Sequence, residues 1–226
     1  MNLEHWTAVD HYVADLLISP DPVLEAALQT CTEAGLPPIS VAPNQGKLLQ
    51  LLVKMQGARN ILEIGTLGGY STIWLARALP ADGHLVTLEA EPLHARIARK
   101  NIARAGLEKK VEIRSGQALD ILKQLVAEKH GPFDFIFIDA DKPSTAEYFE
   151  WAVRLSRNGS MIIVDNVVRE GAVIDADSSD LAVQGVRRFY EKLSGDRRVT
   201  ATAIQSVGSK GYDGFAAAMV IVEPGG

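Results

Sequence analysis

The chain has 226 residues, of which 47% are hydrophobic and 23% are charged, and its formal net charge is -5 at pH 7. This composition excludes a disordered chain, and the net charge gives no general attraction to nucleic acid or to anionic lipid. The single cysteine, Cys31, excludes an internal disulfide and a thiol cluster for zinc, so we expect a reducing, cytoplasmic setting. No uncharged apolar run is long enough to span a bilayer and the first residues lack a secretory pattern, so we expect a soluble chain.

The first part of the chain predicts helices around an extended segment. Apolar residues recur at three- and four-residue steps over 6–17 and 23–34, and a third helix is predicted over 45–55. Between the second and third helices, the prolines of 36–43 remove backbone donors. This stretch is therefore predicted to be an extended, lid-like segment.

The domain organisation follows from a change in pattern. We expect residues 1–57 to form a helical cover with the lid segment, and residues 58–226 to form an α/β sheet unit within the same single domain, because strands and helices alternate from there onward. The N-terminal helices carry more apolar surface than a solvated appendage needs. We therefore expect them to cover the active-site edge of the sheet and to help form a homodimer.

A glycine-rich turn joins the first predicted strand, residues 60–64, to a helix. Gly65, Gly68 and Gly69 let the backbone approach a ligand closely, and the helix that follows offers unpaired N–H groups at its start. The turn is therefore expected to bind a nucleotide-like ligand.

The residues around this turn weigh against a dinucleotide. A dinucleotide fingerprint needs glycine at its third and sixth positions, where this chain has Leu67 and Tyr70. Glu63 places a carboxylate just before the turn, which would repel a phosphate and suits a ligand that carries positive charge. A nicotinamide-dependent oxidoreductase is therefore kept only as an alternative.

A second carboxylate closes the next predicted strand, residues 84–89. In nucleotide-binding α/β folds an acid at this place holds a ribose diol, because two hydroxyl donors match two carboxylate oxygens. Glu89 is therefore a ligand candidate, and the alternative is an exposed acid at a strand end. The chain continues with a strand over 111–114 and a helix over 118–129.

Two later strands, predicted over 133–138 and 161–164, each run straight into polar residues. These residues are Asp139, Asp141, Asp165 and Asn166. The carboxyl ends of neighbouring parallel strands meet at one edge of a sheet, so these side chains are expected to converge there. Oxygen donors without histidine or cysteine favour Mg²⁺, Mn²⁺ or Ca²⁺ over zinc. The alternative is that the acids only cap the turns that follow.

Three motifs together resemble one enzyme family. EIGTLGGYS over 63–71, FIDADK over 137–142 and VDNV over 164–167 are similar, in order and spacing, to the class I S-adenosylmethionine-dependent, cation-dependent O-methyltransferases of the caffeoyl-CoA and catechol type. The resemblance implies a Rossmann-like α/β fold with a seven-stranded, mostly parallel sheet, an antiparallel last strand and helices on both faces. Its last strand pair would lie at about 199–204 and 215–222.

The resemblance also implies the residues of the site. A divalent cation, Mg²⁺ before Mn²⁺ or Ca²⁺, would be held by Asp139, Asp165 and Asn166. Lys142 would be the base for the substrate hydroxyl, with Asp139 beside it. The residues implied to bind S-adenosylmethionine are Val41, Glu63, Gly65, Gly69, Ser71, Glu89, Gln117, Ala118 and Asp139.

The chemistry of the implied reaction agrees with these residue types. A free phenol has a pKa of about 10, and a divalent cation lowers that pKa by stabilising the anion that attacks a sulfonium methyl group. Two adjacent hydroxyls can chelate the cation together, which orients one oxygen toward the methyl group. The resemblance therefore implies an enzyme that methylates a hydroxyl of a catechol-like small molecule.

A methyltransferase that acts on RNA is the remaining alternative. A basic stripe at helical spacing is formed by Arg96, Arg99, Lys100 and Arg104, and a solvated helix face is the favoured explanation for it. Nucleobase amino-methylating enzymes usually carry an Asn/Asp-Pro-Pro-aromatic turn after the fourth strand, where this chain has Asp-Ala-Asp-Lys. We therefore expect a phenolic small molecule as substrate, and neither nucleic acid nor membrane as partner.

Two departures from the family pattern bear on the choice of substrate. A tyrosine that is usual in the family is replaced by Thr145, within a Ser-Thr-Ala-Glu run over 144–147 that predicts a capping box for the next helix. The usual double glycine before the fifth strand is replaced by Asn158-Gly159-Ser160. Neither departure touches a metal or cofactor position. The acidic stretch over 169–180, which also bears on the substrate, is predicted to be a mobile rim over the active site.

Overall fold

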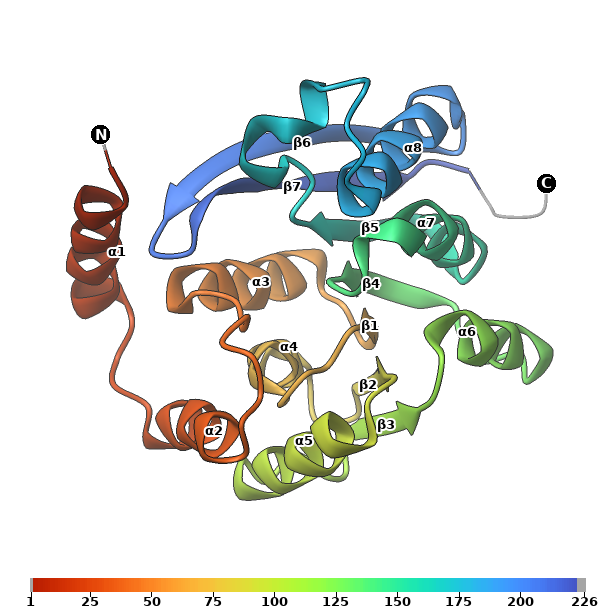
Figure 1. Cartoon of the computed structure of the whole chain (residues 1–226). Helices are drawn as coiled ribbons and strands as arrows, with labels where there is room; N and C mark the ends of the chain where they lie inside the picture. The colour runs from red at the N-terminus through yellow and green to blue at the C-terminus, as the bar shows by residue number, and fades with distance from the viewer. Residues whose placement is uncertain (1, 223–226) are drawn as a thin grey trace.

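A computed structural model describes residues 2–222; Met1 and residues 223–226, which belong to the predicted domain, lie outside the described part. Within the described residues seven strands form one sheet in the order β3-β2-β1-β4-β5-β7-β6 (Figure 1). The strands are β1 Asn60–Ile64, β2 His84–Glu89, β3 Val111–Ser115, β4 Phe133–Ile138, β5 Ser156–Asp165, β6 Val199–Gly208 and β7 Gly211–Val220. All neighbours pair in parallel except β7, which runs antiparallel to β5 and β6. This topology confirms the predicted fold class.

Helices cover both faces of the sheet, with α3, α4 and α5 on one face and α6, α7 and α8 on the other (Figure 1). The helices are α1 Leu3–Leu17, α2 Pro22–Glu33, α3 Pro43–Gln56, α4 Tyr70–Ala78, α5 Pro92–Arg104, α6 Ala118–Ala127, α7 Thr145–Arg154 and α8 Leu181–Gly195, with short 3₁₀ segments η1 Lys142–Ser144 and η2 Arg169–Ile174. Within residues 2–222, no helix combines the length and the apolar character that crossing a bilayer requires.

The central strand β4 shows why the sheet forms here. All of its residues are buried, because helices pack on both of its faces. Phe135 and Phe137 contact the core beneath α3 and α4, whereas Ile136 and Ile138 contact the core beneath α6 and α7. Each such side chain stabilises the fold by about 1.5–3 kcal/mol. A continuous apolar run is therefore required at this place, and it delivers Asp139 to the carboxyl edge of the sheet.

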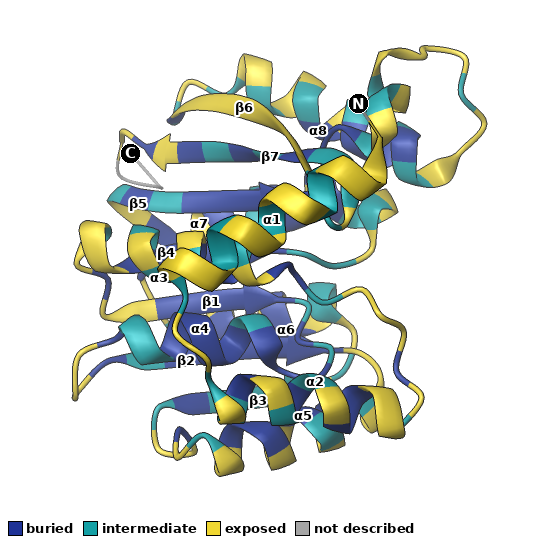
Figure 2. Cartoon of the chain, turned by 90° about the vertical axis from the view of Figure 1, so that its left-hand side faces the viewer, coloured by how far each residue is buried: buried dark blue, intermediate teal, exposed yellow. Residues whose placement is uncertain are grey.

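The opposite end of the sheet is built differently. β6 is the edge strand, and most of its side chains are exposed. Figure 2 shows α1 beside it, with mostly exposed and intermediate residues and none that is buried. Asp10 holds α1 in place, since Ser209 donates a backbone hydrogen bond to its Oδ2 at 2.7 Å and Asn44 Nδ2 donates to its carbonyl oxygen at 3.2 Å. The N-terminal helix therefore lies on the sheet edge through few polar contacts.

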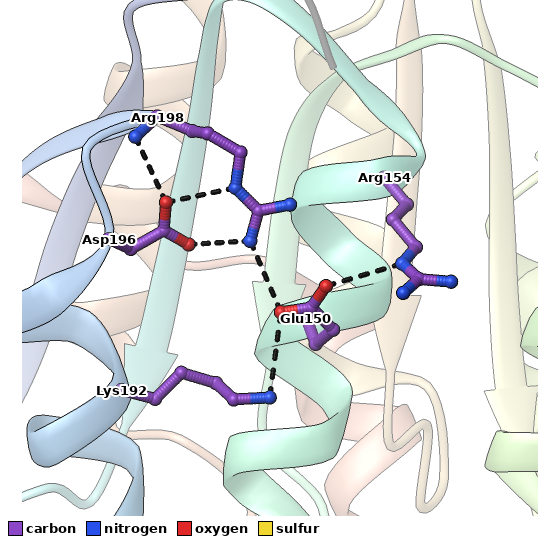
Figure 3. Close-up of polar contacts among 5 residues, drawn as sticks. All are labelled: Glu150, Arg154, Lys192, Asp196 and Arg198. Atoms are coloured by element: carbon purple, nitrogen blue, oxygen red, sulfur yellow. Dashed lines mark hydrogen bonds and ion pairs between the residues drawn. The ribbon is translucent and has the colours of Figure 1, made fainter. Parts of the chain in front are cut away.

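An ion-pair network joins α7 to the segment between α8 and β6 (Figure 3). Glu150 accepts from Arg154 at 3.2 Å, from Lys192 at 3.5 Å and from Arg198 at 3.1 Å. Arg198 also donates to Asp196 at 2.6 Å. Because the bases outnumber the acids in this group, each carboxylate is compensated, and the pKa values of Glu150 and Asp196 are lowered despite partial burial.

The predicted boundaries differ from the observed ones in modest ways. The helices predicted over 6–17, 23–34 and 45–55 begin one to three residues earlier, at Leu3, Pro22 and Pro43. The last two strands are longer toward their shared turn than predicted, because their antiparallel pairing continues as far as Gly208 opposite Gly211.

The predicted capping box at 144–147 is wrong. The side chain of Ser144 makes no capping hydrogen bond to α7. Instead, Asp141 Oδ2 accepts from the Ser144 N–H at 3.2 Å, and Thr145 Oγ1 donates to the carbonyl oxygen of Lys142 at 2.9 Å. The reason is that η1 continues directly into α7, so the capping side chain is Asp141, which precedes η1.

The predicted rim over 169–180 starts as an ordered segment. η2 occupies its first half, and the N–H groups of Val168 and Arg169 both donate to Asp213 Oδ1 at 2.9 Å. The start of the rim is therefore attached to β7. Its mobility stays a prediction.

Candidate active site

A cavity of about 500 Å³ opens at the carboxyl ends of the central strands. It lies between the glycine turn after β1, the end of β2, the turn before α6 and the polar residues after β4 and β5. The predicted site residues that line it are Val41, Gly65, Ser71, Glu89, Gln117, Ala118, Asp139, Lys142 and Asn166. The predicted residues that do not line it are Glu63, Gly69 and Asp165.

The predicted cover over this edge needs a correction. From the first 57 residues, the cavity is lined by Ile39, Ser40 and Val41, which belong to the extended segment between α2 and α3. Within residues 2–222, neither α1 nor α2 contributes to the lining, because α2 packs against α4 and α5 while α1 lies against α3 and β6. The lid-like segment, and not the helices, therefore borders the cavity.

Glu63 lies beneath the glycine turn and not in the cavity. Its side chain is fully buried, and its carboxylate accepts hydrogen bonds from Ser71 Oγ at 2.6 Å, from Thr87 Oγ1 at 2.7 Å and from Thr72 Oγ1. Burial raises the pKa of Glu63 to about 7, although the three hydroxyl donors oppose the shift. Glu63 therefore joins the start of α4 to β2 and orients Ser71, which does line the cavity.

Glycine is required at two positions of the turn for different reasons. At Gly65 the backbone has φ +98° and a Cβ would lie 2.0 Å from the carbonyl oxygen of Asp139, so only glycine lets these segments approach. Gly69 caps α4 with φ +83°, a left-handed conformation that favours glycine, while a Cβ there would make only an ordinary contact with Ala98 at 3.5 Å. Gly65 thus lets two segments of the cavity approach, whereas Gly69 allows the backbone to turn into α4.

Glu89 fastens the turn to the end of β2. Its Oε2 accepts from the N–H groups of Thr66 at 3.2 Å and Leu67 at 2.7 Å, and its Oε1 accepts from the N–H of Glu91 at 2.9 Å. The carboxylate is largely buried and still borders the cavity. Oε2 already accepts two hydrogen bonds, but Oε1 accepts only one and has a second lone pair, so Glu89 can accept a hydroxyl donor of a ligand through Oε1 while it holds the turn.

The acid and amide side chains after β4 and β5 come together at one side of the cavity. Lys142 Nζ lies 2.9 Å from Asp139 Oδ1, and the Lys142 side chain is only 12% exposed. Asp165 is 5% exposed. Burial, followed by the negative charge of Asp139, raises the pKa of Asp165 to about 7. Two carboxylates that repel each other beside a single lysine form an incompletely compensated group.

This group fits a hard divalent cation. Asp139, Asp165 and Asn166 supply oxygen donors only, which is the donor set that Mg²⁺ and Ca²⁺ prefer. The N–H of Asn166 donates to Asp165 Oδ1 at 2.9 Å, and the left-handed backbone of Asn166, with φ 58°, follows directly from β5. A cation here would compensate both causes of the raised pKa of Asp165, its burial and the negative charge of Asp139.

Sequence reasoning missed two residues of this region, Gln45 and Tyr148, and named a third, Arg169, only as the first residue of the predicted rim over 169–180. Gln45, from α3, donates through Nε2 to Asp165 Oδ2 at 2.5 Å. The Tyr148 hydroxyl donates to Asp141, and burial together with this carboxylate raises the pKa of Tyr148. Arg169 lines the cavity and pairs with Asp213 across 3.5 Å. Neither of the two missed residues had a usable signal, because Asp141 precedes η1 and lies outside the helical period of α7 that carries Tyr148.

The chain matches known proteins over almost all of its length. The family profile described as O-methyltransferase matches residues 18–212. A catechol O-methyltransferase from Niastella koreensis is 58% identical, over 97% of this chain and 100% of its own length. The O-methyltransferase from Bacillus cereus, solved in complex with SAH, has a TM-score of 0.96 and 63% identity, with coverage of 97% of this chain and 100% of its own.

A second solved structure agrees with the first. The O-methyltransferase TomG from Streptomyces achromogenes, involved in tomaymycin synthesis and solved in complex with SAM, has a TM-score of 0.94 and 53% identity, with coverage of 98% of this chain and 99% of its own. The family match, the identities and the shared fold all point away from a nicotinamide-dependent oxidoreductase. The chain belongs to the O-methyltransferase family.

Proposed function

We propose that this protein transfers a methyl group from S-adenosylmethionine to a hydroxyl of a catechol-like, vicinal dihydroxy aromatic small molecule. The observation that carries this proposal is that Asp139, Asn166 and Lys142 line one cavity with the glycine turn, while buried Asp165 lies directly behind them and interacts with the charges of Asp139 and Lys142. The catechol O-methyltransferase from Niastella koreensis and the SAM- and SAH-bound structures of relatives support it.

The cofactor would lie along the turn side of the cavity. Val41, Gly65 and Ser71 line the part nearest the start of α4 and would contact the methionine portion, while Glu89 would accept from the ribose hydroxyls. Gln117, Ala118 and Asp139 complete the proposed cofactor lining. Glu63 and Gly69 would contribute from beneath, because they fix the turn without reaching the cavity.

The substrate would lie on the acidic side. A divalent cation, Mg²⁺ before Mn²⁺ or Ca²⁺, would supply the positive charge that lowers the pKa of a phenol, and Asp139, Asp165 and Asn166 would hold it. In its neutral amine form, Lys142 Nζ would accept the phenolic proton, and Asp139 Oδ1 at 2.9 Å would stabilise the resulting ammonium. In this proposal the oxygen donors bind the cation, and the lysine accepts the proton from the substrate hydroxyl.

Removal of the metal tests this proposal directly. Protein treated with a chelator should bind S-adenosylmethionine but methylate no catechol, and Mg²⁺ or Mn²⁺ should restore turnover. Asp165→Ala should lower turnover by at least about 10²–10³-fold at saturating Mg²⁺, the scale of losing one preorganised electrostatic group. It should keep its cofactor affinity, because Asp165 lies away from the turn.

The matched control is Asp120→Ala, which removes an exposed acid of α6 that pairs only with Lys123 among the described residues. It should leave turnover unchanged. Calorimetry with S-adenosylmethionine and a methyl-transfer assay with labelled cofactor provide the two readouts. Full activity toward a catechol in excess chelator, with no metal left by elemental analysis, would contradict the metal-dependent mechanism and leave a metal-free methyltransferase.

A small-molecule substrate is proposed in preference to RNA. The basic side chains of α5 are exposed on the outer surface of that helix, and two of them are engaged locally. Arg104 donates to the carbonyl oxygen of Ala26 at 3.1 Å, and Arg99 donates to Ser115 at 3.0 Å. This supports a solvated face that also fastens α5 to its neighbours. Buried, free Cys31 is compatible with the proposed cytoplasmic location.

We also propose a homodimer that uses the α1 side of the molecule. Tyr12, Leu16 and Leu17 on α1 are each at least 65% exposed, and Ile204 on the neighbouring edge strand is half exposed. An exposed apolar surface of this kind is usually covered by another chain. Light scattering at micromolar concentration should give twice the monomer mass, and Leu16→Asp should lower it; a monomer throughout would contradict the proposal.

A further inference from the structure

Two histidines and a glutamate meet at the amino ends of the strands, at the edge opposite the cavity. His84 begins β2, Glu112 is the second residue of β3, and His130 lies in the segment between α6 and β4. Val86 pairs with Glu112 across the parallel strands, so Val86 and Glu112 share a face. Because His84 stands two residues before Val86, its side chain lies on that same face, beneath α6.

The donor atoms of these three side chains are close enough for one ion. One ligand atom from each of His84, Glu112 and His130 lies within 4.8 Å of the others. His84 Nε2 and Glu112 Oε2 are 3.4 Å apart. Donors bound tetrahedrally to Zn²⁺ at about 2.0–2.1 Å stand about 3.3–3.4 Å from one another, so this pair already has the required spacing.

The neighbours of the cluster orient its members. The ring of His130 stacks on Phe133, with ring centroids 6.1 Å apart and planes 16° from parallel. Arg114 donates to Glu112 Oε1 at 2.7 Å, which leaves Oε2 turned toward His84. An ion could therefore use Oε2 without breaking this hydrogen bond. Such outer partners, which fix the rotamer of a ligand, are typical of metal sites.

The local charge also favours a cation. Arg114 brings one positive charge and is shared between Glu112 and Glu128, whose Oε2 lies 2.7 Å from Nη1. With neutral imidazoles, the two carboxylates exceed the single guanidinium by one negative charge.

We propose that His84, Glu112 and His130 form a zinc site that is separate from the catalytic cavity. Two imidazoles and one carboxylate suit Zn²⁺ and not the hard cations of the active site, and a water would complete the tetrahedron. The side chains of His84 and Glu112 are 39% and 37% exposed, so an ion can enter from solvent. The bound ion would fasten β2, β3 and the segment before β4 to one another, at a distance from the reacting groups.

Calorimetric titration of metal-free protein with Zn²⁺, in excess Mg²⁺ to occupy the proposed active-site position, tests this inference. We expect one Zn²⁺ per chain. His84→Ala and His130→Ala should each lower the affinity by more than about 100-fold, beyond the roughly 10–100-fold cost of losing only an outer partner. His11→Ala, which removes an exposed histidine of α1, is the matched control and should bind Zn²⁺ like the native chain.

Cobalt provides an independent readout. Co²⁺ added under the same conditions should give the visible absorption of a tetrahedral ion in the native chain and in His11→Ala, and this absorption should be absent in Glu112→Gln. Circular dichroism and S-adenosylmethionine binding establish that each variant is folded.

Each possible outcome decides the proposal. Zn²⁺ binding that is equal in the native chain, His84→Ala and His130→Ala would place the ion elsewhere and overturn it, as would no Zn²⁺ uptake at all. If one histidine variant does not fold, the other variant and Glu112→Gln give the same test. The result is independent of the methyl-transfer reaction, because none of these residues lines the cavity.

Discussion

The acids of the cavity and the acids of the α7–α8 network are compensated in opposite ways. In the network, Glu150 contacts three bases, Asp196 contacts Arg198, and the pKa values of both carboxyls are lowered (Figure 3). At the cavity, Asp139 pairs with Lys142, while Asp165 is buried beside them, and burial together with the charge of Asp139 raises the pKa of Asp165 to about 7. Both groups contain charged residues, but only the acids at the cavity have fewer basic partners than carboxylates.

The difference separates a structural role from a chemical one. A compensated network lowers the energy of the folded chain without needing anything further, whereas a buried acid with a raised pKa costs stability unless a ligand completes it. Glu63 belongs with the second kind, because it is fully buried, has only hydroxyl partners and has a pKa of about 7. Acids of this second kind lie at the carboxyl edge of the sheet, where the cavity opens.

Among these variants, Lys142→Ala should have the largest effect, because it removes the base that pairs with Asp139. Turnover should fall by about 10²–10⁴-fold, the usual contribution of a positioned base, while Mg²⁺ and S-adenosylmethionine still bind. Higher pH should restore part of the activity, because solvent then supplies the ionised phenol. Steady-state rates at neutral and alkaline pH, with calorimetry for binding, measure these effects.

The chain contains a closely matched control for this variant. Lys123 pairs with Asp120 at the same i,i+3 spacing, with 3.1 Å between Nζ and Oδ1, but its side chain is 60% exposed. Lys123→Ala should therefore leave turnover unchanged. A native rate in Lys142→Ala would remove the lysine from the mechanism.

Glu63→Gln should sharpen the comparison through pH. The pKa of Glu63 is about 7 in the folded chain against an ordinary value of 4.5, so the folded state binds the proton more tightly and stability falls as pH rises from about 4.5 to 7. Glutamine does not titrate, so Glu63→Gln does not lose stability over this pH range through residue 63. The native chain should therefore be more stable relative to Glu63→Gln at pH 5 than at pH 8, by up to about 3 kcal/mol.

Urea unfolding of both chains at the two pH values measures this difference. Glu150→Gln is the opposite control. Its carboxyl has a lowered pKa, so its contribution is present above the ordinary value of 4.5 and is lost as pH falls through the folded value. A Glu63 contribution that grows toward pH 8 would show that the carboxylate is charged and compensated.

The rule that carboxyl ends of neighbouring parallel strands converge was enough to predict the position of the acid cluster. It placed Asp139, Asp165 and Asn166 together because each stands at or directly after the end of a strand. The burial of Glu63 was not predictable in the same way. Its partners Thr72 and Thr87 lie on different elements. The same sequence motif is compatible with a carboxylate that binds a ligand and with one that joins two elements by hydrogen bonds.

Contacts between distant helices and the cluster were also beyond sequence patterns. Gln45 reaches Asp165 from 120 residues away. Nothing in the period of α3 distinguishes this glutamine from a solvated one. Such contacts depend on the exact position of each helix along the sheet, and small differences in core packing determine that position.

The smallest expected effect tests the network itself. Glu150→Gln should lower the free energy of unfolding by only about 0.2–1 kcal/mol, because its partners are partly exposed and Arg198 keeps Asp196. High salt should reduce this loss, and turnover should stay native. Arg59→Gln, which removes an isolated exposed pair with Asp82, is the control for a pair outside any network.

A larger effect of Glu150→Gln would point to a connection between the two groups of acids. α8 packs against η1 so closely that a Cβ at Gly185 would lie 2.1 Å from the carbonyl oxygen of Lys142. The network fastens α7 to the end of α8, so its loss could let α8 shift against the residue proposed as the base. If turnover falls while the unfolding free energy changes by less than about 1 kcal/mol, the network positions Lys142, and the separation between a structural and a chemical group fails.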